Sequence, residues 1–331
     1  MQNNRYPKIH VRSKNELVKR LVSAGTPENS AVALINDSLA NFDTYWKDHP
    51  RLSRPGDEKW VRDASGTKLG RLLNLIDRAV LKPYDHLLPN FIFGGISGRD
   101  HKSAVRHLLG RKRGRVLLKL DITRFYEQIS QERVVQFFAL KASCGQQGAA
   151  LFGKLCCVPF GAKDQPQARK TIARGFATSS RLAVWCNLDV FLKLERLVTK
   201  ELKGKDPRIA IYVDDIGITA SHASKEDLMR LYPKIEAILA GDRNQKLPLN
   251  KKKTEIIFHN GDTYNVDGSF KGKWGFEHLG LQMNRNSLTP GTKTRWKIAD
   301  VTHRLKTSTN RPISLRRSKK GLSRYKKYIQ K

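Results

Sequence analysis

Two short apolar segments that end in carboxylates constrain the fold of this chain most. Residues 116–121 read Val-Leu-Leu-Lys-Leu-Asp, and residues 208–218 read Arg-Ile-Ala-Ile-Tyr-Val-Asp-Asp-Ile-Gly-Ile. Short apolar runs of this kind are typical of buried strands. Apolar residues on both sides of Asp214 and Asp215 predict a hairpin with the acidic pair at its turn. Pairing with the first strand would add Asp121, although it lies 93 positions away (214 minus 121).

Three carboxylates at one end of two strands predict a metal site. Adjacent carboxylates in an apolar setting repel one another unless a cation lies between them, and magnesium prefers such oxygen ligands. We therefore expect Asp121, Asp214 and Asp215 to hold two Mg²⁺ ions, with Mn²⁺ as an alternative. Two such ions can activate a hydroxyl and stabilise a leaving pyrophosphate. An Asp-Asp pair by itself is more often a surface turn, so this prediction depends on its context.

The charge of the chain indicates a polyanionic partner. Its 331 residues include 63 Lys or Arg and 30 Asp or Glu, a net charge of +33. Phosphate contacts offset the self-repulsion of such a chain through counterion release, so nucleic acid is the expected partner. A protein that is merely basic is the alternative. No apolar run of about 18 residues and no apolar signal core occur, so we expect no membrane association and a cytoplasmic protein.

Helices are expected before and between the two apolar segments. Ser13 and Glu16 have the form of a capping box before a helix. Periodicity predicts further helices, a later strand and two loops. The helices are 30–46, 72–84, 131–140, 180–202 and 224–239, the strand is 254–258, and the loops are 49–70 and 90–99. The four cysteines form no Cys-x-x-Cys pair, so we expect reduced, partly buried thiols and no zinc site.

Several segments resemble, in order, the motifs of reverse transcriptases. Tyr-Val-Asp-Asp at 212–215 matches their Tyr-x-Asp-Asp signature, and Leu-Asp-Ile-Thr-Arg-Phe-Tyr-Glu-Gln-Ile at 120–129 resembles the first catalytic motif. Four further segments resemble the fingers region of retron and group II intron enzymes, the third motif, the fourth motif and the primer grip. They are residues 93–107, 174–180, 249–254 and 276–280.

The resemblance implies an α+β protein with the right-hand polymerase fold. This fold has fingers, a palm with an antiparallel sheet backed by helices, and a short helical thumb. The expected division is a helical N-terminal extension at 1–55, interleaved fingers and palm at 56–285, and a short basic thumb or tail at 286–331.

The resemblance also assigns roles to residues of the first two motifs. Asp121, Asp214 and Asp215 match the catalytic metal ligands, and Ile122 would lend a backbone carbonyl. Tyr126 lies five positions after Asp121, where the family keeps a ring that blocks a ribose 2′-hydroxyl. It should make the enzyme prefer deoxynucleotides, unless it is a core aromatic residue.

The third and fourth motifs suggest further nucleotide contacts. Ala-Arg-Gly at 173–175 stands where Pro-Gln-Gly is usual. Arg174 could contact the triphosphate or template base, although a guanidinium does not reproduce the hydrogen bonding of an amide. Gly175 would allow close backbone approach. Lys253 would protonate pyrophosphate or be a solvated lysine, and Arg71 and Arg99 could bind phosphates.

Two segments are expected to hold the nucleic acid itself. The primer-grip residues are His278, Leu279 and Gly280. Residues 311–331 hold nine Lys or Arg and no acid, which suits a thumb that clamps RNA, although a charged tail is usually solvated. The predicted nucleic-acid contacts there are Arg316, Arg317, Lys319, Lys320, Arg324, Tyr325, Lys326 and Lys327.

The number of residues after the primer-grip motif limits which type of reverse transcriptase is expected. Only 46 residues follow the primer grip (331 minus 285), too few for an RNase H or integrase domain, and no retron-like Val-Thr-Gly is present. The chain resembles the small bacterial defence-associated enzymes. This implies a structured noncoding RNA as template or scaffold, deoxynucleoside triphosphates as substrates, a DNA product, and antiphage defence.

Four alternatives remain open at this stage. Two are enzymes: a retron-type reverse transcriptase, and a polymerase that adds nucleotides without a template. A catalytically silent RNA-binding protein would explain the charge but not the three acids. A structural ribonucleoprotein component would not need paired carboxylates in apolar strands.

Overall fold

The computed structural model describes residues 6–330, apart from 113, 242–245, 285–286 and 308–312. The chain forms two interleaved compact units. The first unit consists of residues 1–98, 123–192 and 239–248, and the second of residues 99–122, 193–238 and 249–331. The expected boundaries after residues 55 and 285 do not separate these units, so the three-part division stays a prediction.

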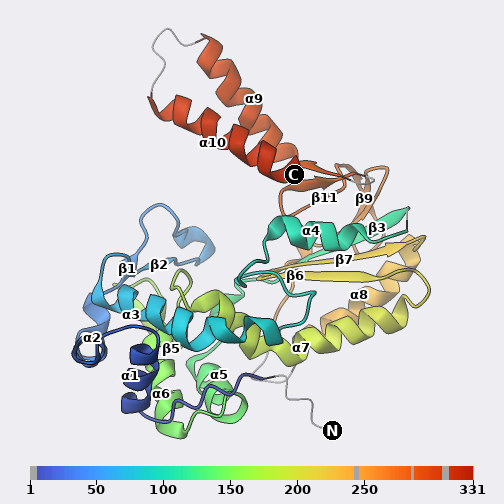
Figure 1. The fold of residues 1–331 in the computed structure, drawn as a ribbon. Helices are drawn as coiled ribbons and strands as arrows, with labels where there is room; N and C mark the ends of the chain where they lie inside the picture. Colours follow the sequence, from blue (N-terminus) through green and yellow to red (C-terminus); the bar gives the residue numbers. More distant parts are fainter. Residues whose placement is uncertain (1–5, 113, 242–245, 285–286, 308–312, 331) are drawn as a thin grey trace. The chain divides into compact units, whose positions relative to one another are not determined.

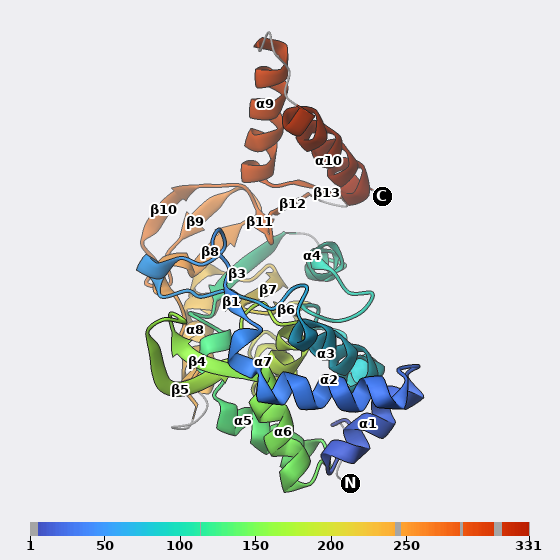
Figure 2. The same ribbon diagram turned by 90° about the vertical axis from the view of Figure 1, so that its left-hand side faces the viewer.

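The second unit contains a six-stranded antiparallel sheet with the order β10-β9-β8-β3-β7-β6 (Figures 1 and 2). Its strands are β3 (Arg115–Asp121), β6 (Arg208–Tyr212), β7 (Asp215–Ser221), β8 (Glu255–Phe258), β9 (Asp262–Tyr264) and β10 (Phe270–Lys273). The sheet and its helices confirm the α+β class and the antiparallel sheet. The right-hand polymerase arrangement stays a prediction.

The two faces of this sheet differ because side chains alternate along each strand. One face carries fully buried apolar pairs such as Leu118 and Ile218. The other face carries Lys119 opposite Gly217 and Asp121 opposite Asp215. Helix α4 (His101–Leu109) covers this polar face, and α8 (Lys225–Ala240) lies along the apolar face (Figure 1). The carboxylates therefore lie at the end of a sheet face that is not purely apolar.

A small sheet and two helices complete the second unit. The sheet contains β11 (Glu277–His278), β12 (Leu281–Met283) and β13 (Leu288–Pro290), and the helices are α9 (Thr292–Thr307) and α10 (Ile313–Gln330). The two helices form an antiparallel hairpin (Figure 2). Val301 and Leu305 are buried in this hairpin, and Leu322 packs against them. This small apolar contact joins two helices that are otherwise highly basic.

The first unit is mainly helical. Its helices are α1 (Lys14–Ser23), α2 (Glu28–Ala40), α3 (Lys68–Ile76), α5 (Gln131–Gln136), α6 (Gln146–Cys156) and most of α7 (Ser179–Glu201). Two short hairpins are added by β1 (Lys47–Asp48) with β2 (Arg62–Asp63) and by β4 (Cys157–Gly161) with β5 (Pro166–Ile172). Large aromatic residues fill the core, where Phe138 and Phe152 stack with ring centroids 4.1 Å apart.

Several predicted element boundaries were wrong for local reasons. The helix expected from residue 72 begins at Lys68, because the Thr67 hydroxyl caps it by accepting from the Gly70 N–H at 3.1 Å. After Ile76 it continues only as a π turn and a 3₁₀ segment that contains Pro83. The helix expected to reach residue 46 ends at Ala40. The loop expected at 49–70 contains β2.

The four cysteines are free thiols, and three of them are buried. Burial raises the pKa of Cys144 to about 11 and that of Cys156 to about 12, so both are protonated at neutral pH. The burial agrees with the prediction of partly buried thiols, and their reduced state stays a prediction. Among the described residues, no helix combines the length and apolar character needed to cross a membrane.

Candidate active site

The backbone of the second unit brings the three predicted carboxylates to one end of its sheet. Asp121, the last residue of β3, pairs directly with Asp215, the first residue of β7. Tyr212 also pairs with Asp215, so only two residues form the turn between β6 and β7. The Ile122 N–H donates to the Asp214 carbonyl at 2.9 Å, which fixes the turn against the end of β3. The predicted hairpin is confirmed.

The turn of this hairpin contains a strained residue. Val213 has φ +60°, in the left-handed region. A β-branched residue rarely adopts this conformation, and such strain costs on the order of 1–3 kcal/mol. The strand pairing on both sides and the bond from Ile122 hold the residue in place. Strained turns of this kind concentrate at functional sites. In this turn the strained residue comes directly before two consecutive carboxylates, Asp214 and Asp215.

The carboxylates are only partly neutralised by the protein. Partial burial, followed by repulsion from Asp214 and Asp121, raises the pKa of Asp215 to about 7. The Lys253 ammonium lies 3.1 and 3.3 Å from the two Asp121 oxygens. Lys119 and Lys253 act in the opposite direction on the pKa of Asp215, but their effect is smaller. The site thus has an excess of negative charge that a bound cation would relieve.

The donor set suits a hard divalent cation, but the side chains are not arranged as a formed metal site. Carboxylate oxygens at adjacent strand ends are the ligands that Mg²⁺ prefers. Within the described part of the chain, no group of three His, Cys, Asp or Glu side chains converges closely enough to hold a metal ion. Asp121 faces Lys253 instead. Metal binding therefore requires these side chains to turn towards one another, and the two-ion site stays a prediction.

The predicted primer-grip residues form the turn between β11 and β12. His278 pairs with Leu281, which leaves a two-residue turn. Leu279 and Gly280 have φ of +51° and +73°, the left-handed conformation of the tight turns that suit the twist of a hairpin. Gly280 is exposed and Leu279 is half-buried, so the tip of this hairpin is accessible to a ligand.

His278 packs against β7, the strand that begins with Asp215. Its ring lies so close to Gly217 that a Cβ there would be 2.8 Å from Nε2, which means that only glycine fits. The ring is fully buried, and both of its nitrogens lack a hydrogen-bond partner within the described part of the protein. Burial, and then the charge of Lys119, lowers the pKa of His278 to about 3. His278 is therefore neutral and joins β11 to β7.

A second cluster of predicted residues lies in the first unit. Tyr126 begins a 3₁₀ turn, and its hydroxyl lies 2.9 Å from the Ser180 hydroxyl. Arg174 donates two hydrogen bonds to Glu127, at 3.0 and 2.9 Å, and its guanidinium lies 4.8 Å from the Tyr126 ring centroid. Sequence reasoning did not single out Glu127 or Ser180, because neither residue type indicates which distant partner it will have.

The other predicted phosphate and nucleotide contacts are divided between the two units. Gly175 lies where the backbone approaches another segment, since the Arg62 N–H donates to the Arg174 carbonyl at 2.6 Å. Arg71 is exposed on α3 in the first unit. Arg99 belongs to the second unit, directly before the helix cap of α4. The structure does not bring these residues together within one unit, and their roles stay predictions.

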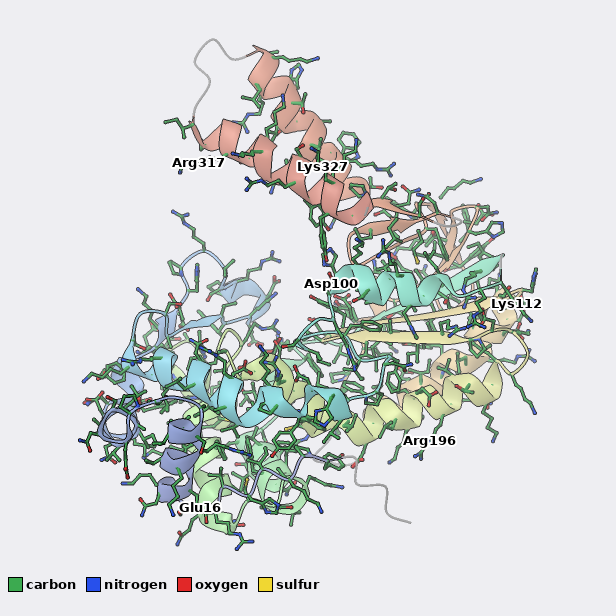
Figure 3. All side chains as sticks on the ribbon, in the orientation of Figure 1. Glu16, Asp100, Lys112, Arg196, Arg317 and Lys327 are labelled. Atoms are coloured by element: carbon green, nitrogen blue, oxygen red, sulfur yellow. The ribbon has the colours of Figure 1, made fainter. Side chains whose placement is uncertain are left out.

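The basic C-terminal residues line a groove between α9 and α10, which we call the cationic groove. It has a volume of about 670 Å³ and is lined by Lys306, Lys319, Lys320, Arg324 and Lys327, with Thr302, Leu305 and Ser323. None of the described residues that line it is acidic. Figure 3 shows Arg317 and Lys327 projecting from α10. Lys306 was missed because it lies on the preceding helix, and the predicted Arg316 side chain lies outside the described residues.

Tyr325 has a packing contact that the sequence did not predict. Its ring stacks on His101 with centroids 5.8 Å apart, and its hydroxyl lies 3.0 Å from His101 Nε2. Next to it, the Lys102 ammonium donates to the Tyr328 carbonyl at 2.7 Å. These contacts attach the end of α10 to the start of α4, which Asp100 marks in Figure 3. A contact of Tyr325 with nucleic acid stays a prediction.

Comparisons with known proteins give little further information. No protein family model and no curated protein matches the sequence. One solved structure that matches part of this chain is that of telomerase from Candida albicans in complex with the TWJ fragment of telomeric RNA. The match has 12% identity and a TM-score of 0.43, and it covers 78% of this chain and 45% of that chain. A likeness at this level assigns no function to the site.

Proposed function

We propose that this protein is an RNA-directed DNA polymerase that uses Asp121, Asp214 and Asp215 for two-metal nucleotidyl transfer. The observation that carries the proposal is the pairing of Asp121 with Asp215 beside a strained two-residue turn. This geometry supplies three acidic groups at one strand end, next to a primer-grip-like hairpin. The reverse-transcriptase motifs in the sequence supply the reaction class.

The chain's own residues have distinct tasks in this reaction. Two Mg²⁺ ions, when bound, would activate the primer 3′-hydroxyl and stabilise the leaving pyrophosphate. Asp215 must lose its proton to become a ligand, which a pKa near neutrality allows. Lys253, which pairs with Asp121 in this structure, would be released if a cation bound Asp121 and could then donate a proton to pyrophosphate. His278 holds the β11–β12 hairpin against the strand that begins with Asp215.

We propose a structured noncoding RNA as the partner, deoxynucleoside triphosphates as substrates, and DNA made in antiphage defence as the product. The net charge of +33 and the cationic groove support the RNA partner. The defence role rests on the sequence resemblance to small bacterial enzymes.

Synthesis without a template is a second candidate. The observation that favours it concerns the third motif. Arg174 stands there where the family usually has Gln, and its guanidinium pairs with Glu127. Product sequence separates the two candidates. Templated synthesis gives DNA complementary to a bound RNA, whereas untemplated addition gives DNA unrelated to it.

The test is to purify the protein with its copurifying RNA, sequence that RNA, and add Mg²⁺ with the four deoxynucleotides. DNA complementary to the RNA supports the proposal, and non-complementary DNA supports untemplated addition. Asp214→Asn should abolish either product. Asp262→Asn is the matched control, because Asp262 lies on β9 of the same sheet and pairs with Lys273. A folded, RNA-bound protein that makes no DNA would favour the binding-only alternative.

A further inference from the structure

The ring of Tyr126 is held at two points by other side chains of the first unit. Its hydroxyl shares a hydrogen bond of 2.9 Å with the Ser180 hydroxyl, in the first turn of α7. The Arg174 guanidinium lies over the ring, 4.8 Å from its centroid. A tyrosine side chain has two rotatable bonds, so a restraint at its tip and another at its face leave the ring one orientation.

Both groups that hold the ring are themselves fixed. Arg174 makes a bidentate ion pair with Glu127, and the exposed fractions of the two side chains are only 13% and 8%. A buried, bidentate pair keeps the planar guanidinium in one place. The backbone of Gly95 packs closely against Ser180 and restricts its movement. A Cβ at position 95 would lie only 2.5 Å from the Ser180 Cβ. The restraints on Tyr126 are therefore rigid.

We propose that Ser180 and the Arg174–Glu127 pair are positioning residues, which set how strongly the enzyme rejects ribonucleotides by fixing the orientation of the Tyr126 ring. The inference rests on the proposed function, together with the role that the reverse-transcriptase resemblance implies for Tyr126, exclusion of the ribose 2′-hydroxyl. A ring excludes a hydroxyl group only if it cannot rotate away from it. Removing a restraint lets the ring move, so ribonucleotides enter more readily while the ring itself is still present.

The experiment measures kcat/KM for one deoxynucleotide and its ribonucleotide, and compares their ratio between variants. Ser180→Ala and Tyr126→Phe both remove the shared hydrogen bond and keep the ring. Each should raise relative ribonucleotide use about fivefold, the factor that corresponds to one net hydrogen bond. The double variant should show the same increase as each single one, because both remove the same interaction. Glu127→Gln should raise it less, about twofold, by loosening Arg174.

The matched control is Ser179→Ala. Ser179 is the adjacent residue, but its hydroxyl donates to the Ala173 carbonyl at 2.6 Å and has no part in holding Tyr126. This variant should leave the ratio unchanged even if it lowers stability. A role of Ser180 in stability alone would lower the melting temperature without changing the ratio, and this result would overturn the proposal.

Tyr126→Ala separates failure of the inference from failure of the proposed function. If Tyr126→Ala raises ribonucleotide use but Ser180→Ala and Tyr126→Phe do not, the ring matters and its positioning by Ser180 is wrong. If Tyr126→Ala has no effect on an active enzyme, Tyr126 is a core residue and the inference is also wrong. A folded wild-type protein that incorporates neither nucleotide would contradict the proposed function itself, and the inference with it.

Discussion

The acidic hairpin β6–β7 and the helical hairpin α9–α10 both gather charges of one sign, but in different settings. Asp214 and Asp215 lie half-buried at a strand end, where burial and mutual repulsion raise the pKa of Asp215. The cationic groove gathers five Lys or Arg between two exposed helices that share a small apolar contact. The first cluster would suit small divalent cations in a fixed place, as proposed for two Mg²⁺ ions, and the second would suit an extended polyanion bound by many similar contacts.

The largest expected effect is the loss of chemistry on breaking the first cluster. Asp214→Ala or Asp215→Ala should reduce nucleotide incorporation by at least about 1,000-fold, because each removes a ligand of the ions that stabilise the transition state. RNA binding, measured by filter retention, and the circular dichroism spectrum should remain nearly unchanged. Retained synthesis by either variant would rule out the assigned active site.

The second prediction concerns the stability of the metal-free protein. The pKa of Asp215 is about 7 in the folded state and near 3.8 when unfolded. The folded state therefore binds this proton more tightly, and the associated stability is present below pH 3.8 and lost as the pH rises to about 7. Asp215→Asn cannot ionise. With EDTA above pH 7 it should be more stable than wild type, by on the order of 1–3 kcal/mol.

Thermal unfolding with EDTA and with Mg²⁺ checks this prediction. Mg²⁺ should raise the melting temperature of the wild type, because it relieves the repulsion, and should raise that of Asp215→Asn much less. Equal melting temperatures of the two proteins in EDTA at pH 8 would mean that neither burial nor repulsion destabilises the ionised Asp215 carboxylate in the folded state.

The third prediction concerns the cationic groove. A triple variant, Lys319→Gln, Lys320→Gln and Arg324→Gln, should weaken RNA binding. Each lost phosphate contact should reduce the slope of log affinity against log salt by about 0.7 to 0.9. The matched control removes three cations of α9 that do not line the groove, Lys293, Lys297 and Arg304. If both triple variants change the slope equally, the groove has no special role.

The smallest expected effect concerns the attachment of α10. Lys102→Met removes the bond to the Tyr328 carbonyl and the contact with the Tyr328 ring. It should destabilise the protein by about 1 kcal/mol and increase amide hydrogen exchange at the end of α10. Lys112→Met, in the loop before β3, serves as the exposed control. Unchanged exchange in α10 would mean that other contacts hold its end.

Prediction from sequence succeeded where the signal is local. The two strands predicted to carry the carboxylates are short apolar runs with acids at their ends, and the observed register places Asp121 beside Asp215 as expected. The capped start of α1 is also present, since the Ser13 hydroxyl accepts from the Glu16 N–H. Prediction failed for α3, whose cap at Thr67 lies in a segment expected to be a loop. It also failed to anticipate the β4–β5 hairpin, whose outer strand is mostly polar and exposed.

The sequence by itself determined the strands that carry the carboxylates, the acidic turn between β6 and β7, and the basic character of the C-terminal segment. Tertiary structure alone decided which side chains hold Tyr126, Arg174 and Tyr325. Their partners lie 54, 47 and 224 positions away. Alternation along a strand is a local property that any neighbouring residues reveal. A hydroxyl, a guanidinium or a ring can pair with many partners, and only the packed chain selects one of them.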